Sequence, residues 1–229
     1  MKILCFIPAR GNSKELKNKN IYPFLGKPLI SHTINFSKKI KKLTTFVSTD
    51  SKKILHIAKK HKVNFNYLRP KKFSGDNSNV IFSVIHALNW LEKRKYFFDA
   101  VLLLQPTTPL RSKKELEKII NIFTKENMDS ITTVIKMSEH PSECIFIKKK
   151  SWSFLKTEKN GTARQNYKNN YFFIDGSIYL AKTKFIKKYK TFVKKGFTEI
   201  FKSSQKYPID INSKKDLKIA EFLNENKLL

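Results

Sequence analysis

Short apolar runs alternate with segments of helical period along most of this 229-residue chain. The runs have the length and composition of buried strands, and the segments between them repeat apolar residues every three to four positions. Such alternation is typical of an α/β fold, in which helices cover a mainly parallel sheet. We expect strands at Ile3–Ile7, Thr44–Ser48, Val63–Leu68, Ala100–Leu104 and Ser130–Ile135, and helices at Leu29–Ile40, Ser51–His61 and Asn79–Leu91, from Ser112 and from near Ser213.

The last two helices carry a further start signal. A glutamate, Glu115, stands three residues after Ser112, and an aspartate, Asp216, stands three residues after Ser213. A serine followed at this spacing by an acidic residue predicts a capping box, in which each side chain satisfies a backbone N–H at the start of the helix. We expect both helices to begin this way.

The alternation breaks down between Glu139 and Tyr171, where Lys, Asn and aromatic residues follow no clear period. Aromatic side chains such as Trp152, Phe154 and Tyr167 in an irregular arm would be hard to keep soluble alone. We therefore expect residues 139–171 to leave the core and pack on a second subunit, giving a homodimer. No repeat or linker divides the chain, so residues 1–229 are expected to form one domain that contains this excursion.

The chain is strongly basic, with 47 Lys and Arg against 18 Asp and Glu and a formal net charge of +29. Such a charge attracts nucleic acid, so a polynucleotide-binding protein is the rival hypothesis from a different class. The lysines, however, are spread from end to end, and the sequence has no aromatic RNA-binding motif, no paired Cys/His finger and no helix-turn-helix pattern. We expect no dedicated nucleic-acid partner.

The remaining composition predicts a cytoplasmic protein. No apolar stretch reaches the roughly 20 residues that a membrane span needs. The amino-terminal apolar run ends at Pro8, which is too short for the core of a signal peptide. The two cysteines, Cys5 and Cys144, have no metal-ligand spacing and predict no structural disulfide.

Polar segments follow four of the predicted strands, where ligands bind in open α/β sheets. They read PARGNSKELKNKN, STD, RPKKFSGDNS and LQPTTPLR. The first holds only one glycine, so it is neither a Walker motif nor a dinucleotide fingerprint. Its cations are candidates for phosphate binding instead, with Arg10 offering a planar fork and Lys14 and Lys19 offering point charges.

Two other residue types in these segments suit a nucleotide site. The prolines of QPTTPLR fix the backbone around Gln105, which suits an amide that hydrogen-bonds a ligand. Asp50, Asp76 and Asp210 are candidate Mg²⁺ ligands, because hard cations bound to phosphates prefer carboxylate oxygens. For Asp50 a helix cap is the competing interpretation.

The motifs of this chain resemble, in their order, those of a known family. IPARGNSK, then Lys19-Asn20, STD, LRP, LLQPTTPLR, ARQ, GSIYL and finally PIDIN before DL occur in the order and spacing of the acylneuraminate cytidylyltransferases, also called CMP-sialic acid synthetases. The resemblance covers essentially the whole chain, and the ordered set is far more specific than any single motif. It implies a Rossmann-like nucleotide-diphospho-sugar transferase fold. It also implies transfer of CMP from CTP to the anomeric hydroxyl of a nine-carbon keto-sugar acid, with Mg²⁺ as cofactor and pyrophosphate as second product.

The resemblance also assigns roles to residues of this sequence. It places the CTP phosphates near the first loop and the sugar acid near Gln105, and it gives a catalytic role to Arg164 of ARQ, together with Lys19. The implied nucleotide-binding residues are Arg10, Lys14, Lys19, Asn20, Asp76 and Ser78; the implied substrate-binding residues are Arg69, Gln105 and Arg164; and the implied metal ligands are Asp210 and Asn212.

The sequence departs from the family pattern at two places. The family commonly has Asp-x-Asp near the carboxyl end, where this chain reads Asp210-Ile211-Asn212, and it has Asn-Gly where this chain reads Asp175-Gly176. Either the two exchanges are coincidental or the carboxylate has moved. The alternatives of the same fold, with 3-deoxy-manno-octulosonate (KDO) or a hexose phosphate as the acceptor, stay open, and so does a non-catalytic relative.

Overall fold

A six-stranded sheet forms the centre of the computed structural model, which describes residues 1–13, 15–76, 78–149, 151–155, 170–205, 207–226 and 228. The strand order is β10-β6-β9-β5-β1-β4. Every strand runs in the same direction except β9, which is antiparallel to both of its neighbours. The strands are β1 (Ile3–Pro8), β4 (Leu43–Ser48), β5 (Ala100–Leu103), β6 (Ser130–Lys136), β9 (Phe172–Lys182) and β10 (Thr198–Lys202). The predicted α/β class with a mainly parallel sheet is confirmed.

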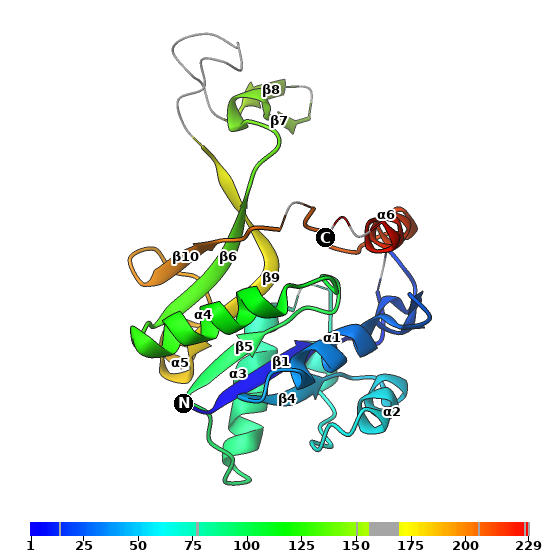
Figure 1. Cartoon of the computed structure of the whole chain (residues 1–229), viewed down its shortest axis with the longest axis vertical. Coiled ribbons are helices and arrows are strands. Elements are labelled where there is room, and N and C mark those ends of the chain that lie inside the picture. The colour runs from blue at the N-terminus through cyan, green and yellow to red at the C-terminus, as the bar shows by residue number, and fades with distance from the viewer. Residues whose placement is uncertain are drawn as a thin grey trace.

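Helices cover both faces of this sheet (Figure 1). One apolar cluster joins α1, α2 and α4 to one face, and a second joins α3 and α5 to the other. The helices are α1 (Leu29–Lys38), α2 (Lys52–Lys60), α3 (Val80–Glu92), α4 (Lys113–Lys125), α5 (Thr183–Tyr189) and α6 (Lys214–Glu225). Short elements lie between them: η1 (Lys19–Ile21), β2 (Pro23–Phe24), β3 (Lys27–Pro28), η2 (Lys71–Phe73), η3 (Pro141–Glu143), β7 (Ile145–Lys148) and β8 (Ser151–Phe154).

Strand β1 shows why its sequence is continuously apolar. Ile3, Cys5 and Ile7 pack into the cluster on one face, whereas Leu4 and Phe6 pack into the cluster on the other. Successive side chains of a strand point to opposite faces, so a strand covered on both sides needs no polar position. The same holds for β5, where all four residues are buried.

The strand predicted at Val63–Leu68 is wrong. Within this described segment the backbone makes only an isolated bridge, Thr49 to Leu68, beside the edge strand β4. Side-chain packing holds the segment instead, because buried Tyr67 lies among the rings of Phe46 and Trp90. Alternating burial therefore arises here without a ladder of backbone hydrogen bonds.

The two predicted capping boxes have different outcomes. Ser213 and Asp216 form a complete capping box at the start of α6. Ser112 caps α4 by accepting from Glu115 N at 3.2 Å, but the carboxylate of Glu115 accepts hydrogen bonds from Ser203 and Ser204. The second half of the box at α4 is thus wrong, because the segment after β10 runs close enough to take the carboxylate.

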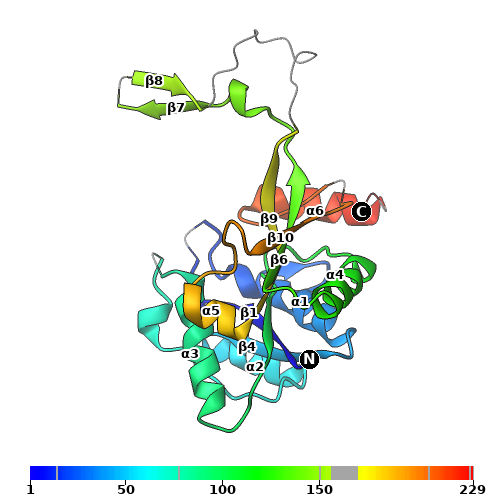
Figure 2. The same ribbon diagram turned by 90° about the vertical axis from the view of Figure 1, so that its left-hand side faces the viewer.

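An arm projects from the body at the far ends of β6 and β9 (Figures 1 and 2). Its described part contains η3 and the antiparallel hairpin of β7 and β8, in which every residue is exposed. The hairpin presents large apolar side chains to solvent: Ile145, Phe146, Ile147, Trp152 and Phe154. The hairpin falls within the predicted excursion of residues 139–171, of which residues 150 and 156–169 lie outside the described part of the chain, and the role of this excursion in dimerisation stays a prediction.

Among the residues that the structure describes, no helix has the length and apolar character required to cross a membrane. Cys5 and Cys144 are both free thiols.

Candidate active site

Strand β1 lies between β4 and β5 in the sheet. After β1 the chain continues to β4 on one side of it, and β5, which comes later in the sequence, lies on the other side. Such a switch point opens a crevice at the carboxyl ends of the strands. A cavity of about 300 Å³ occupies this position. Its lining includes seven of the predicted site residues: Arg10, Lys19, Asn20, Arg69, Asp76, Ser78 and Gln105.

The loop after β1 is fixed by its own neighbours. Gly11 N donates to Asp50 Oδ1 at 2.8 Å, and Asn20 Nδ2 donates to the carbonyl of Arg10 at 2.9 Å. A Cβ on Gly11 would stand 3.0 Å from Ser51 Cβ, which is tighter than most Cβ contacts, so any larger residue would require Ser51 to shift. Asp50 therefore anchors the loop, and the helix cap of α2 is Ser51 rather than Asp50.

Arg69 is the most unusual cation of the cavity, since its side chain is only 5% exposed. Its Nη1 donates to Ser83 at 3.3 Å, and its Nη2 lies 4.0 Å from Asp50 Oδ1. Its Nε and Nη2 are buried without a hydrogen-bond partner. Burial lowers the pKa of Arg69, with Asp50 acting in the opposite direction. A buried guanidinium with unused donors at a cavity wall is a site for an anion.

Arg10 and Asp76 meet at the mouth of the same cavity. Arg10 Nη1 lies 2.5 Å from Asp76 Oδ1. Both side chains are more than a third exposed, at 35% for Arg10 and 40% for Asp76. Exposed ion pairs contribute little to stability, so this pair opens at low cost when an anion competes for Arg10. Ser78, nearby, donates to the carbonyl of Lys72 at 3.3 Å.

Lys19 links the cavity to the predicted metal pair. Its Nζ donates to Asn212 Oδ1 at 2.8 Å, and Asn212 Nδ2 in turn donates to Asp210 Oδ2 at 2.9 Å. Burial lowers the pKa of Lys19, and nearby Asp210 opposes that shift. The structure thus brings Asp210 and Asn212 to the edge of the site although they lie near the end of the chain.

Sequence reasoning missed Arg111, which holds the Gln105 loop in place. Its Nη2 donates to Gln105 O and to Thr108 Oγ1, and its Nε donates to Ser177 O at 2.8 Å. Burial lowers the pKa of Arg111 to about 10, so the group remains charged at neutral pH. Its only sequence signal is its position at the end of QPTTPLR, between a buried strand and a helix cap.

The irregular part of β9 stands behind Gln105. The pairing of β6 with β9 shifts register between Thr132 and Val134, and Gly176 adopts a φ of +76° there. A Cβ on Gly176 would lie 3.5 Å from Gln105 Nε2. A bulge in β9 therefore brings its backbone against the Gln105 amide.

Asp175 does not replace the missing carboxylate of the metal pair. Its side chain is buried and accepts hydrogen bonds from the hydroxyls of Thr133 and Ser177, both at 2.5 Å. Among the described residues it makes no hydrogen bond or ion pair with Asn212. The hypothesis of a moved carboxylate is not supported by this geometry, and both oxygens of Asp175 serve the bulge.

Two predicted site residues, Lys14 and Arg164, lie outside the described residues. Among the residues that are described, no group of three or more His, Cys, Asp or Glu side chains is arranged to hold a metal ion. The arrangement is instead a cation-rich cavity that has carboxylates at its edges. It suits an anionic ligand such as a triphosphate.

Comparison with known proteins agrees with the motif order. A relative named CMP-N,N'-diacetyllegionaminic acid synthase, from Legionella pneumophila, is 34% identical over 98% of this chain and 97% of that protein. Pseudaminic acid cytidylyltransferase from Campylobacter jejuni is 26% identical over 97% of this chain and 96% of its own.

The fold is also shared with a solved structure, that of CMP:2-keto-3-deoxy-manno-octonic acid synthetase complexed with CTP. It matches with a TM-score of 0.71 at 15% identity and covers 99% of this chain and 100% of its own. The sequence profile of the cytidylyltransferase family matches residues 4–229. With a match across nearly its whole length, this chain belongs to the cytidylyltransferase family.

Proposed function

We propose that this protein transfers CMP from CTP to the anomeric hydroxyl of a nonulosonic, sialic-acid-like sugar and releases pyrophosphate. The observation that carries the proposal is the buried Arg69 guanidinium, whose Nε and Nη2 lack partners at a cavity shared with Arg10 and Lys19. The names of the two relatives described above support a nonulosonic acid as the acceptor.

In this reaction the sugar oxygen attacks the α-phosphorus, the bond to the β-phosphate breaks, and the hydroxyl loses its proton. The chain needs no covalent intermediate, because positioning and charge neutralisation suffice for phosphoryl transfer. Arg10, Lys19 and Arg69 are suited to hold the phosphates, since each offers a cation to the cavity. Gln105, fixed from behind by Arg111, is suited to orient the sugar acid.

We further propose Mg²⁺ as the cofactor. Mg²⁺ usually binds proteins through one or two carboxylates and takes its other oxygens from phosphates and water. Asp210 supplies one carboxylate, and Asn212 supplies an amide oxygen that now accepts from Lys19. The donor set therefore fits the ion if Lys19 turns to the phosphates. The ion would neutralise charge on the departing pyrophosphate, and Lys19 and Asn212 would hold the triphosphate beside it.

A homodimer is the proposed assembly. The hairpin of β7 and β8 exposes Ile147, Trp152 and other apolar side chains far from the core (Figure 2). Contiguous apolar surface of this kind marks interaction sites in soluble proteins. A second copy of this chain is the proposed occupant.

The reaction class is tested by measuring pyrophosphate release with CTP, GTP, UTP and ATP against a panel of keto-acid sugars and a hexose phosphate. We expect release only with CTP, a nonulosonic acid and Mg²⁺ together. Turnover with GTP but not CTP would contradict the base assignment, and turnover with the hexose phosphate alone would contradict the acceptor. Tight polynucleotide binding with a steep salt dependence and no turnover would favour the nucleic-acid hypothesis instead.

A further inference from the structure

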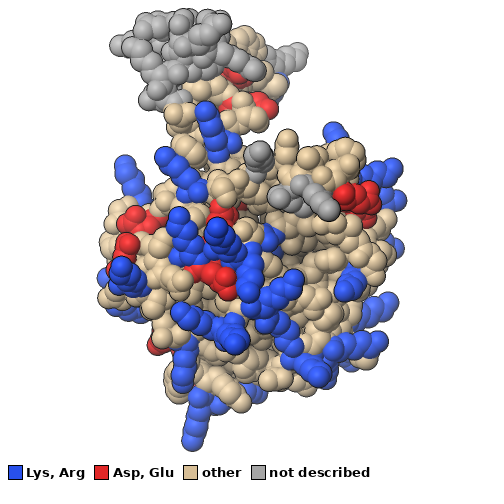
Figure 3. All heavy atoms as spheres, viewed as in Figure 1, with Lys and Arg blue, Asp and Glu red and all other residues tan. Residues whose placement is uncertain are grey.

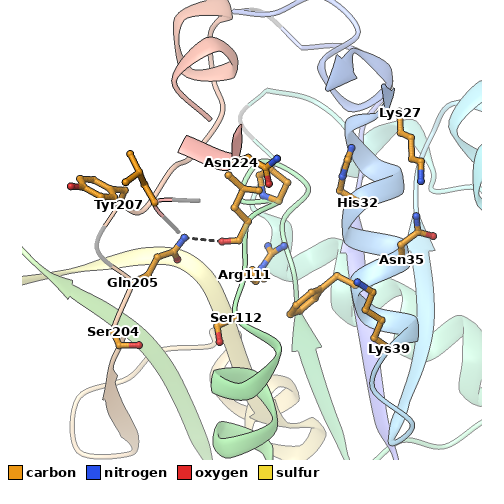
Figure 4. Close-up of a pocket in the computed structure, with 14 residues that line it drawn as sticks. Lys27, His32, Asn35, Lys39, Arg111, Ser112, Ser204, Gln205, Tyr207 and Asn224 are labelled. Carbon is orange, nitrogen blue, oxygen red and sulfur yellow. Dashed lines mark hydrogen bonds between the residues drawn. The ribbon is translucent and has the colours of Figure 1, made fainter. Parts of the chain in front are cut away.

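A second and larger cavity lies away from the candidate active site, between α1, the start of α4, the segment after β10 and α6 (Figure 4). We call it the α1–α6 cavity. Its volume is about 950 Å³, which is within the range of small-molecule sites. The described lining residues are Lys27, His32, Asn35, Phe36, Lys39, Pro109, Leu110, Arg111, Ser112, Ser204, Gln205, Tyr207, Asn224 and Leu228.

The charged side chains among the described lining residues of the α1–α6 cavity are all basic. Lys27, Lys39 and Arg111 contribute cations, and none of the described lining residues is acidic. The nearby carboxylate of Glu115 is occupied by hydrogen bonds from Ser203 and Ser204. Lys and Arg also cover much more of this side of the molecule than Asp and Glu do (Figure 3). The cavity therefore presents a positive field to an entering ligand.

The same lining offers both neutral donors and apolar surface. Asn35 and Asn224 carry amide groups, while Leu110 and Tyr207 carry apolar or aromatic surface. The Gln205 amide is already used, since its Nε2 donates to Leu110 O at 2.7 Å across the cavity wall. That bond and the Arg111 contacts hold the wall without a ligand. A mixture of cations, amides and apolar surface suits a phosphorylated small molecule better than a purely apolar one.

We propose that the α1–α6 cavity is a second binding site, for a phosphorylated small molecule whose anionic groups lie between Lys27 before the start of α1 and Lys39 at its end. Arg111 gives this site a physical link to the candidate active site, because the guanidinium that lines the cavity also donates to Gln105 O and Ser177 O. A ligand in the cavity would thus contact the group that positions the Gln105 loop. The proposal does not depend on the identity of the reaction.

The test separates the two sites by substitution and uses inorganic pyrophosphate as the probe. In an Arg10→Ala/Arg69→Met background, which lacks two cations of the candidate active site, calorimetry should still detect pyrophosphate binding. Adding Lys27→Glu/Lys39→Glu should weaken that binding roughly a hundredfold, because each lost charge-assisted contact corresponds to about a tenfold change or more.

The matched control adds Lys60→Glu/Lys93→Glu to the same background. Lys60 and Lys93 are exposed and line none of the cavities described above, and Lys93, like Lys39, is the C-cap of a helix. This control has the same net charge as the cavity variant, and we expect its affinity to stay within about threefold because distant exposed charges are screened. Circular dichroism checks folding, and Lys27→Gln/Lys39→Gln replaces the reversal variant if that variant is misfolded. Absence of binding in the background, or equal affinity in cavity and control variants, would overturn the proposal.

Discussion

Arg69 carries a positive charge into the protein where it has few partners. Its side chain is 5% exposed, and its Nε and Nη2 make no hydrogen bond. Burying a charge without full pairing costs stability. An apolar side chain in its place removes that cost, and Asp50 keeps its hydrogen bond from Gly11 N. A residue that costs stability and faces a cavity is expected to serve function.

We therefore predict that Arg69→Met leaves the free energy of unfolding unchanged or raises it, while kcat/KM falls roughly ten- to a hundredfold. The fall corresponds to one charge-assisted contact of about 1.5–3 kcal/mol. Urea unfolding and pyrophosphate release measure the two quantities. Arg94→Met is the control, because Arg94 stacks on Trp90 far along α3 and should not affect turnover. Lower stability with unchanged kinetics would show that Arg69 is structural.

Asn212 belongs to a chain of three polar groups that ends at a carboxylate. Its amide accepts from Lys19 and donates to Asp210. In Asn212→Asp a second carboxylate keeps the contact to Lys19 but repels Asp210, and a divalent cation relieves that repulsion. We predict half-maximal activity at a lower Mg²⁺ concentration with little loss of kcat, measured by titrating Mg²⁺. An inactive variant would mean that the site requires the asparagine amide.

The start of helix α6 depends on the carboxylate of Asp216. Asp216 Oδ2 accepts from Asn212 N at 2.9 Å and from Ser213 N at 2.7 Å. Burial acts to raise the pKa of Asp216, but these backbone hydrogen bonds outweigh it and the pKa lies below 3.8. A carboxyl with a lowered folded pKa adds stability above its unfolded pKa, and that stability is lost as the pH falls through the folded value.

We predict that Asp216→Asn lowers the free energy of unfolding by about 1 kcal/mol at neutral pH, the usual magnitude for a lost cap. The difference from the native protein should shrink as the pH falls below the ordinary range of an aspartate, where the native carboxyl takes up its proton. Urea unfolding at several pH values measures this. A difference that stays constant with pH would contradict the assigned role of the charge.

Helices and strands with a clear apolar period were predictable from the sequence, whereas features that depend on contacts between distant residues were not. The helix Val80–Glu92 and the strand Ile3–Pro8 follow from local pattern, because each buries a continuous apolar surface. At Val63–Leu68 the same kind of pattern misled, since aromatic packing around Tyr67 replaces a backbone ladder. The bulge of β9 escaped prediction because its register is set by pairing with β6, more than 40 residues away.

The candidate site was predictable only where its residues follow a predicted strand. Arg10, Lys19 and Gln105 stand in loops that directly follow strands, where sequence position indicates function. The unused donors of Arg69, Nε and Nη2, follow from its packing in the folded protein, and the role of Arg111 depends on a carbonyl 66 positions away. Neither feature has a local sequence pattern.

The exposed arm and the body of the molecule differ in the chemical character of their surfaces. The hairpin of β7 and β8 projects from the body (Figure 2) and exposes large apolar side chains, whereas Lys and Arg occupy much more of the body's surface in Figure 3 than Asp and Glu do. We predict a dimer, because like-charged bodies are expected to associate through their apolar parts. Light scattering should give about twice 26.9 kDa at micromolar concentration, and Trp152→Glu/Phe154→Glu should give the monomer. A native protein that is monomeric would contradict the assembly.

The central claim is that the cation-rich cavity at the β1–β5 switch point joins CMP to a sugar. Mass spectrometry of the products from CTP, Mg²⁺ and a nonulosonic acid tests this most directly. The account predicts a CMP–sugar conjugate formed one for one with pyrophosphate, and both products formed roughly ten- to a hundredfold more slowly in Arg69→Met but not in Arg94→Met. Free CMP without a conjugate, or CDP with inorganic phosphate, would contradict it.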